Sequence, residues 1–179
     1  MTHPILVILR AKMALAAAAL EHLKFIDAHQ KSLAVSDPAL YLPAAHTEAM
    51  AANIAGIYTQ LDTALRGLVN AIDGTVDGKG PFTEDTPSLD LLRFATIETA
   101  NRAHIIGPKT FSGLMQLIGF RDDVYGSYAS DLRQHQVFEH AELLDRVAPL
   151  FFSDIETFIT SFEDGDLDRF KLKSGPIPA

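Results

Sequence analysis

The chain has 179 residues, of which 47% are hydrophobic, so it is long and apolar enough to build one domain with its own core. It contains no Cys, which excludes disulfides and thiolate metal sites and fits a cytoplasmic protein. Its formal net charge of -8 lacks the basic footprint of proteins that bind duplex nucleic acid, so any RNA contact requires a local basic patch.

Apolar residues recur at helical spacing from the N-terminus and predict a first helix that ends near His29. The stretch Ser36-Asp37-Pro38 then breaks the chain. Arg10 and Lys12 interrupt the apolar N-terminal residues, which argues against a signal peptide. No stretch approaches the roughly 20 apolar residues of a membrane span. We therefore expect a cytoplasmic protein with no membrane segment.

The most regular amphipathic pattern runs from Met50 to Ile72, with apolar residues every three or four positions. It predicts a second helix of about eight turns. Residues 73–85 are rich in Gly and acids and predict a loop. Thr86-Pro87 is typical of an N-cap followed by Pro at the first helical position, and a third helix is expected to run to about Arg102.

The rest of the chain also favours helices. A fourth helix is expected from near Thr110 to about Leu132. A last helix is expected over the apolar positions of 151–162, where Ser153 and Glu156 could form a capping box and residues 143–147 could extend the helix backwards.

No stretch alternates with the period of a strand. The sequence therefore predicts an all-α, up-down bundle of four to five helices in a single domain over residues 1–163. Residues 164–179 contain Gly, Pro and mixed charge and predict a flexible C-terminal tail.

Metal chemistry in helical bundles commonly relies on Glu-x-x-His pairs that project into the core. No Glu in this chain has a His three residues later, and His135 and His140 are interpreted as solvated side chains. We expect neither a metal nor a cofactor.

The segment from Ile118 to Tyr128, Ile-Gly-Phe-Arg-Asp-Asp-Val-Tyr-Gly-Ser-Tyr, carries the main functional signal. It resembles the signature of HEPN domains, and of HepT-like toxins in particular: Gly-Phe-Arg, a polar residue, a His five residues after the Arg and a Tyr seven after it. Arg121, Asp122 and Tyr128 match this signature, whereas Gly126 occupies the His position.

The surroundings of this segment extend the resemblance to about residues 5–163. The stretch from Arg102 to Gly107 resembles the family's Arg-Pro-Ala-Val-Ile-Ser, which introduces the motif helix at about this distance. A rival register pairs Arg133 with His140, but Glu142 then replaces the Tyr. His140 is therefore a minority candidate for the catalytic His.

The resemblance implies metal-independent RNA cleavage at a groove shared by a homodimer. The Arg would hold a phosphate through two hydrogen bonds, and the His would act as a general acid or base. Gly126 cannot transfer a proton, so we expect an impaired ribonuclease. Arg121, Arg102 and Tyr125 are expected to contact RNA phosphate. Equally, Arg121 could be a buried residue paired with a neighbouring acid.

The resemblance also implies a partner, a minimal nucleotidyltransferase that acts as antitoxin and adenylylates the motif Tyr, here Tyr128. Two alternatives stay open. One is an active endoribonuclease that uses a displaced His, with His140, His135 and His104 as candidates. The other is a helical scaffold or ligand-binding module without an RNA function.

Overall fold

The structure is a computed structural model of the chain, and it describes residues 4–74, 80–99, 102–126 and 132–165. These residues form five helices and no named strand, which confirms the predicted all-α fold. The helices are α1 (Pro4–Ser36), α2 (Pro43–Asp73), α3 (Ser88–Ala95), α4 (Pro108–Gly126) and α5 (Gln134–Gly165). None of them is long and apolar enough to cross a membrane.

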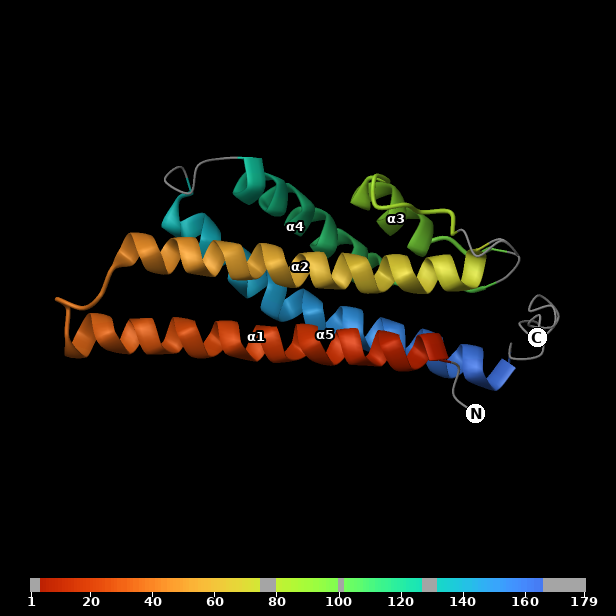
Figure 1. Cartoon of the computed structure of the whole chain (residues 1–179), viewed down its shortest axis with the longest axis horizontal. Helices are drawn as coiled ribbons and strands as arrows, with labels where there is room; N and C mark the ends of the chain where they lie inside the picture. Colours follow the sequence, from red (N-terminus) through yellow and green to blue (C-terminus); the bar gives the residue numbers. More distant parts are fainter. Residues whose placement is uncertain (1–3, 75–79, 100–101, 127–131, 166–179) are drawn as a thin grey trace, which may run out of the picture.

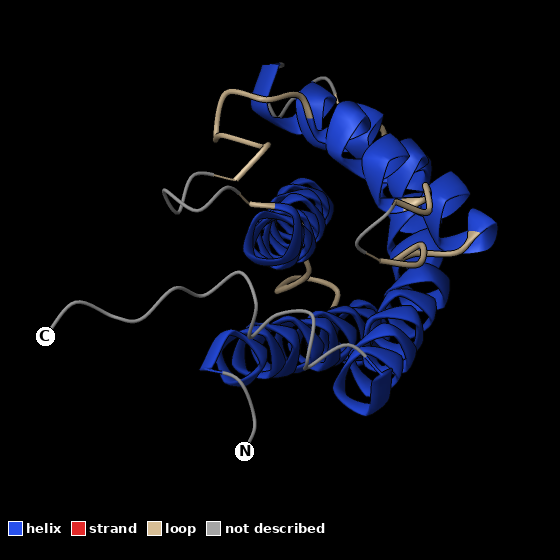
Figure 2. Ribbon diagram, turned by 90° about the vertical axis from the view of Figure 1, so that its right-hand side faces the viewer, coloured by secondary structure: helices blue, strands red, loops and turns tan. Residues whose placement is uncertain are grey.

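Helix α2 is the centre of the bundle, because it packs against each of the other four helices. Figure 1 shows α1 along one side of α2, α3 and α4 along the opposite side, and α5 behind. Figure 2 views the bundle from one end and shows the helices arranged in an arc around α2. Side chains on several faces of α2 therefore reach different layers of the molecule.

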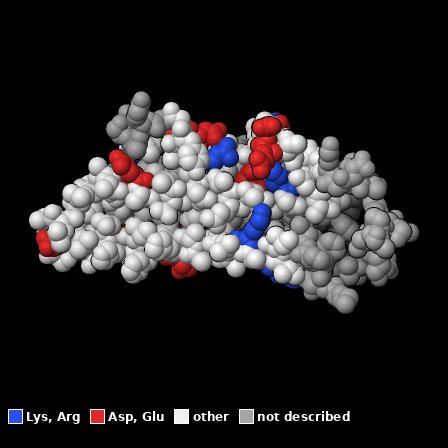
Figure 3. Space-filling view, viewed as in Figure 1, with Lys and Arg blue, Asp and Glu red and all other residues white. Residues whose placement is uncertain are grey.

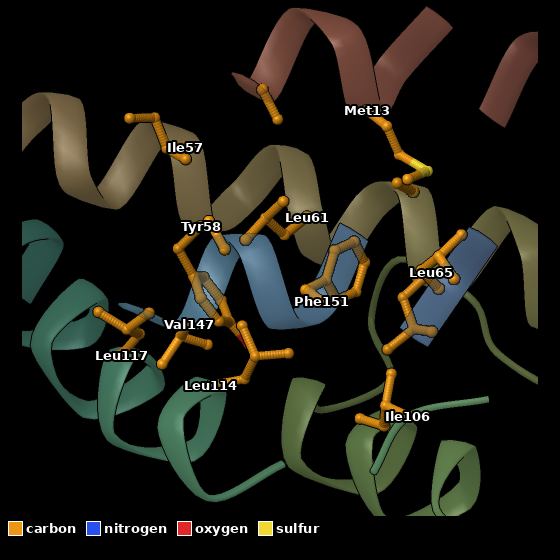
Figure 4. Packing of buried hydrophobic residues seen from close by; sticks show 14 of the residues in the cluster. Met13, Ile57, Tyr58, Leu61, Leu65, Ile106, Leu114, Leu117, Val147 and Phe151 are labelled. Atoms are coloured by element: carbon orange, nitrogen blue, oxygen red, sulfur yellow. The ribbon is translucent and has the colours of Figure 1, made fainter. Parts of the chain in front are cut away.

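The apolar stripe predicted from Met50 to Ile72 forms the core, as its spacing requires. Tyr58, Leu61 and Leu65 are no more than 1% exposed. Figure 4 shows Tyr58 beside Leu114 of α4 and the α5 side chains that close the core from behind. This packing fixes α4, the helix that carries the predicted motif, against α2 and α5.

Helices α4 and α5 lie close together at Gly113. An ideal Cβ at this position would overlap the side chain of Val147. Glycine has no Cβ, so it allows the two backbones to come within a distance that any other residue would prevent. The contact sets how α4, and therefore Arg121, sits on the bundle.

The predicted third helix is wrong in length, since α3 ends at Ala95 rather than near Arg102. The Thr96 hydroxyl and backbone N–H donate to the Arg93 carbonyl and stop the helix. The predicted Thr86 cap is also wrong, because the N-cap is Pro87 and no side chain caps it. The Thr86 hydroxyl instead accepts a hydrogen bond from the Thr83 N–H, 3.1 Å away.

The other predicted bounds differ less. α1 continues to Ser36, beyond the predicted end near His29, and stops at the predicted break. α5 begins at Gln134, so the backward extension over 143–147 is confirmed and the predicted capping box at Ser153 lies inside the helix. The predicted continuation of α4 beyond Gly126 falls mainly on residues 127–131, and the predicted tail mainly on 166–179. Both stretches lie outside the described residues.

Candidate functional site

Arg121 points from α4 toward α2 and the beginning of α3. Its Nε and Nη2 donate to the Asp122 Oδ1 at 3.0 and 2.7 Å, and its Nη1 donates to the Ser88 Oγ at 3.1 Å. The guanidinium lies over the Tyr58 ring, 5.2 Å from the ring centroid. With 21% of the side chain exposed, Arg121 is neither sealed in the core nor fully in solvent.

Arg121 stays positively charged in this environment. Burial disfavours the charged form, but the hydrogen bond and the charge of Asp122 outweigh it, so the pKa of Arg121 is raised. The Asp122 side chain is 60% exposed, and ion pairs of this kind contribute at most about 1 kcal/mol. An incoming anion can therefore replace Asp122 at modest cost.

A pocket of about 410 Å³ opens beside Arg121. Helix α2, the segment before α3, the first residue of α3 and α4 supply its lining: Asp62, Thr63, Arg66, Glu84, Asp85, Thr86, Pro87, Ser88 and Arg121. Figure 3 shows acidic and basic side chains gathered above α2, on the side of α3 and α4. The pocket thus combines two guanidinium groups with three carboxylates.

Arg66 has a structural role in this pocket. Its Nη1 donates to the Thr83 carbonyl at 2.6 Å, and its Nη2 donates to Asp62 at 3.1 Å and to the Thr86 carbonyl at 3.2 Å. These bonds hold the segment before α3 on the surface of α2. Arg121, whose partners are a surface carboxylate and a hydroxyl, is the guanidinium that can exchange a partner for a ligand.

Tyr58 forms the floor beneath Arg121. It is 1% exposed, and its hydroxyl faces Ser88 without a well-directed hydrogen bond. Burial, followed by the negative charge of Asp62, raises the pKa of the Tyr58 phenol well above its ordinary value. The phenol is therefore neutral and lies against the face of the Arg121 guanidinium.

Two further motif positions lie at the end of α4. Gly126 is its last residue, and an ideal Cβ there would meet no atom within 4 Å. The side chain of Tyr125 is 67% exposed. Tyr128, the predicted modification site, lies outside the described residues. Among the described residues, none would obstruct a Cβ at the position of the missing His.

Arg102 lies far inside the protein, with 4% of its surface exposed. Its Nε donates to Asp73 at 2.6 Å, and its other nitrogens donate to the carbonyls of Phe94, Ile97 and Ala103. The geometry gives this guanidinium a structural role, tying the loop after α3 to the end of α2. The predicted contact of Arg102 with RNA phosphate stays a prediction, and the proposed function does not depend on it.

The candidate histidines are spread over the bundle. His140 stacks on Phe120, the residue before Arg121, with ring centroids 4.3 Å apart, and its Nδ1 lies 2.7 Å from the Gln136 carbonyl. His104 lines a separate pocket with Arg102, and His135 is exposed at the start of α5. Among the described residues, no group of three or more His, Asp or Glu side chains could hold a metal ion.

The family model described as HepT-like protein matches residues 49–162 of the chain. The chain belongs to the HepT-like protein family. Comparisons with curated proteins and with solved structures gave no match. The matched HepT-like region includes all of α3 and α4 and most of α2 and α5, and thus every described residue around Arg121.

Sequence reasoning missed four residues of this HepT-like site: Tyr58, Ser88 and the pair of Asp62 and Arg66. The pair had a visible signal, because two opposite charges four residues apart lie within the predicted second helix. Tyr58 lies within the predicted second helix, and Ser88 follows Pro87 at the predicted start of the third. Only the fold brings these α2 and α3 residues beneath the α4 motif.

Proposed function

We propose that this protein is a catalytically impaired ribonuclease of a toxin–antitoxin type system, which holds RNA by its backbone at the Arg121 pocket without cutting it efficiently. The observation that carries the proposal is that the motif keeps a charged, half-buried Arg121 but has Gly126, which has no side chain, at the position of the His. One group can bind a phosphate, and the group that should transfer a proton is missing.

The pocket suits a phosphate oxygen for three reasons. Arg121 presents a planar fork of donors that matches a phosphate, and its present partner Asp122 is easily displaced. The Ser88 hydroxyl already lies within hydrogen-bond distance of Nη1. Ser88 is also the first residue of α3, where the helix end carries partial positive charge.

The acidic residues on the rim limit how tightly RNA can bind. Asp62, Glu84 and Asp85 line the same pocket and repel a polyanion. We therefore propose a contact with about one phosphate rather than a long backbone track. For a single strand, the logarithm of the binding constant should then fall with the logarithm of salt with a slope near -0.7.

Fluorescence anisotropy with a labelled single-stranded RNA tests this proposal. We expect Arg121→Ala to weaken binding at least about tenfold and to flatten the salt dependence, because the phosphate ligand is lost. Arg93→Ala is the matched control, since Arg93 lies on the neighbouring helix α3 and its side chain is 63% exposed. Equal binding by wild type and Arg121→Ala, or equal losses in both variants, would refute the proposal.

We also propose that a minimal nucleotidyltransferase is the partner and that Tyr128 accepts the adenylyl group. The acidic chain surface disfavours a protein partner less than it disfavours RNA. Incubation with the nucleotidyltransferase and labelled ATP should label the wild type and Tyr125→Phe but not Tyr128→Phe. Label on Tyr125 or on neither Tyr would contradict this assignment. Self-association, which the family resemblance implies, is the third part of the proposal.

A further inference from the structure

The chain segment that leads into α3 is fastened to α2. We name residues 80–87 the strap, and Figure 1 shows them in yellow-green between α2 and α3. The Phe82 side chain of the strap is 9% exposed and packs on Phe94 of α3, with ring centroids 5.1 Å apart. The strap therefore has a fixed place in the fold.

Asn70 of α2 binds the strap as a second peptide group would. Its Nδ2 donates to the Phe82 carbonyl at 2.7 Å, and its Oδ1 accepts from the Phe82 N–H at 3.0 Å. Two facing residues of an antiparallel sheet exchange the same pair of hydrogen bonds. One side-chain amide thus satisfies both backbone groups of Phe82, which would cost free energy if they were left unpaired inside the protein.

Gly80 allows the strap to approach Asn70 this closely. An ideal Cβ at position 80 would overlap the Asn70 side chain. Glycine has no Cβ, so the backbone of the strap can lie directly against the amide. Asn70 and Gly80 are therefore complementary, and a substitution at either position should loosen the same contact.

Arg66 holds the strap closer to α3. It lies one turn before Asn70 on the same face of α2. Its guanidinium donates to the carbonyls of Thr83 and Thr86 at 2.6 and 3.2 Å. Asp62, one further turn back, accepts from Arg66 at 3.1 Å. Side chains spaced four residues apart on α2 thus fasten the strap along its length.

The strap leads directly to the Arg121 pocket. Ser88, the next residue, is 8% exposed and accepts a hydrogen bond from Arg121 Nη1 at 3.1 Å. Glu84 and Asp85 of the strap line the pocket. Among the described residues, those that line the pocket do not include Asn70. Any effect of Asn70 on a bound ligand must therefore pass through the strap.

We propose that Asn70 is a positioning residue of the Arg121 pocket. It keeps the strap on α2, and the strap keeps the Ser88 hydroxyl at Arg121 Nη1. Ser88 and the Tyr58 ring beneath the guanidinium then hold Arg121 in one orientation. The inference rests on the proposed function, because the task of Asn70 is to preorganise the phosphate site.

Loss of the Asn70 amide should lower the affinity for RNA without removing the phosphate ligand. Binding must then also order the strap and the Arg121 side chain, so we expect the affinity to fall about three- to tenfold. The salt dependence should keep its slope near -0.7, because Arg121 still receives one phosphate. This combination distinguishes Asn70 from Arg121, whose removal flattens the salt dependence.

Fluorescence anisotropy with the labelled single-stranded RNA measures both effects. Asn70→Ala and Gly80→Ala break one contact from its two sides, so each should weaken binding about three- to tenfold. Asn53→Ala is the matched control and should bind as the wild type does, because the Asn53 amide also lies on α2 but donates to the Ala49 carbonyl of its own helix. Circular dichroism checks that the variants stay folded. Equal losses in Asn53→Ala and Asn70→Ala would overturn the inference.

The Ser88→Ala background separates positioning from a general loss of stability. Asn70→Ala should weaken binding less in this background than in the wild type, because the strap no longer reaches Arg121 through the Ser88 hydroxyl. A general loss of stability would weaken binding by the same factor in both backgrounds. That result would overturn the positioning role of Asn70.

Nuclear magnetic resonance of the free protein tests the positioning role without RNA. The Arg121 Nε–H signal, identified by its absence in Arg121→Ala, should exchange with water faster in Asn70→Ala and Gly80→Ala than in the wild type or Asn53→Ala. Faster exchange in a protein whose wild type binds no RNA would refute the proposed function and support the positioning role. Unchanged exchange, or an RNA affinity of Asn70→Ala equal to that of a wild type that binds RNA, would overturn the positioning role.

Discussion

Gly113 and Gly119 of α4 make a matched pair for testing how the motif helix is packed. Each gains one methyl group on substitution by Ala, in the same helix. At Gly119 the new Cβ meets no atom within 4 Å, whereas at Gly113 it overlaps the Val147 side chain. Gly119→Ala should therefore raise the free energy of unfolding, whereas Gly113→Ala should leave it unchanged or lower it.

The magnitudes follow from two opposing effects. Replacing Gly by Ala in a helix interior stabilises by about 1 kcal/mol, and this effect acts at both sites. Overpacking a core contact costs about 1–3 kcal/mol, and only Gly113→Ala incurs it, because β-branched Val147 has little rotamer freedom to move aside. A protein of this size gains or loses about 2–4 °C in Tm per kcal/mol.

Thermal unfolding followed by circular dichroism measures both variants. We expect Gly119→Ala to raise the Tm by about 2–4 °C. The Tm of Gly113→Ala should lie below the Tm of Gly119→Ala, because only Gly113→Ala overpacks the contact with Val147. Adding Val147→Ala should cost less in the Gly113→Ala background than in the wild type, because it also relieves the overlap. A rise in Tm for Gly113→Ala equal to that of Gly119→Ala would refute the close approach of α4 and α5.

Three further predictions concern buried polar groups. Burial lowers the pKa of His46, so the imidazole binds a proton more readily in the unfolded chain than in the folded protein. The free energy of unfolding should therefore fall as the pH drops below about 6.5. Urea titrations should not find this loss in His46→Phe. Burial raises the pKa of Tyr58, so the folded state retains that proton and stability should fall as the pH rises above about 10. Tyr58→Phe should lack this alkaline loss, and absorbance at about 295 nm should show one Tyr that ionises only on unfolding. Arg102→Met leaves the 7% exposed carboxylate of Asp73 without its charged partner and should destabilise by about 3–5 kcal/mol in urea unfolding. Adding Asp73→Asn should recover part of the loss, and an undiminished loss would argue against the pair.

The long helices were predictable because their apolar residues repeat with the helical period. The stripe on α2 and the break at Ser36-Asp37-Pro38 both appear where the sequence places them. The end of α3 was not predictable in this way. After Ala95 the Thr96 hydroxyl caps the helix, and buried Arg102 donates to the carbonyls of Phe94 and Ile97. The contact with Arg102 depends on the tertiary structure.

The site was predictable only along α4. The motif singled out Arg121 and the gap at Gly126 from sequence spacing alone. Tyr58 and Ser88 lie 63 and 33 residues before Arg121 in the chain, and their roles depend on how α2, α3 and α4 pack. The sequence also offered Arg102 as a phosphate ligand, since residue type alone does not distinguish a buried ion pair from a binding group.

The central claim is that the pocket holds a phosphate but lacks a group to transfer the proton. Cleavage of labelled RNA in the presence of EDTA by Gly126→His tests it most directly, because a Cβ at this position meets no atom of the described residues within 4 Å. General acid–base catalysis typically contributes about 10²–10⁴-fold, so we expect the rate to rise at least about 100-fold over wild type and Gly126→Ala, and the gain to vanish when Arg121→Ala is added. A wild-type protein that cleaves as fast as Gly126→His, or a gain that survives Arg121→Ala, would contradict the claim.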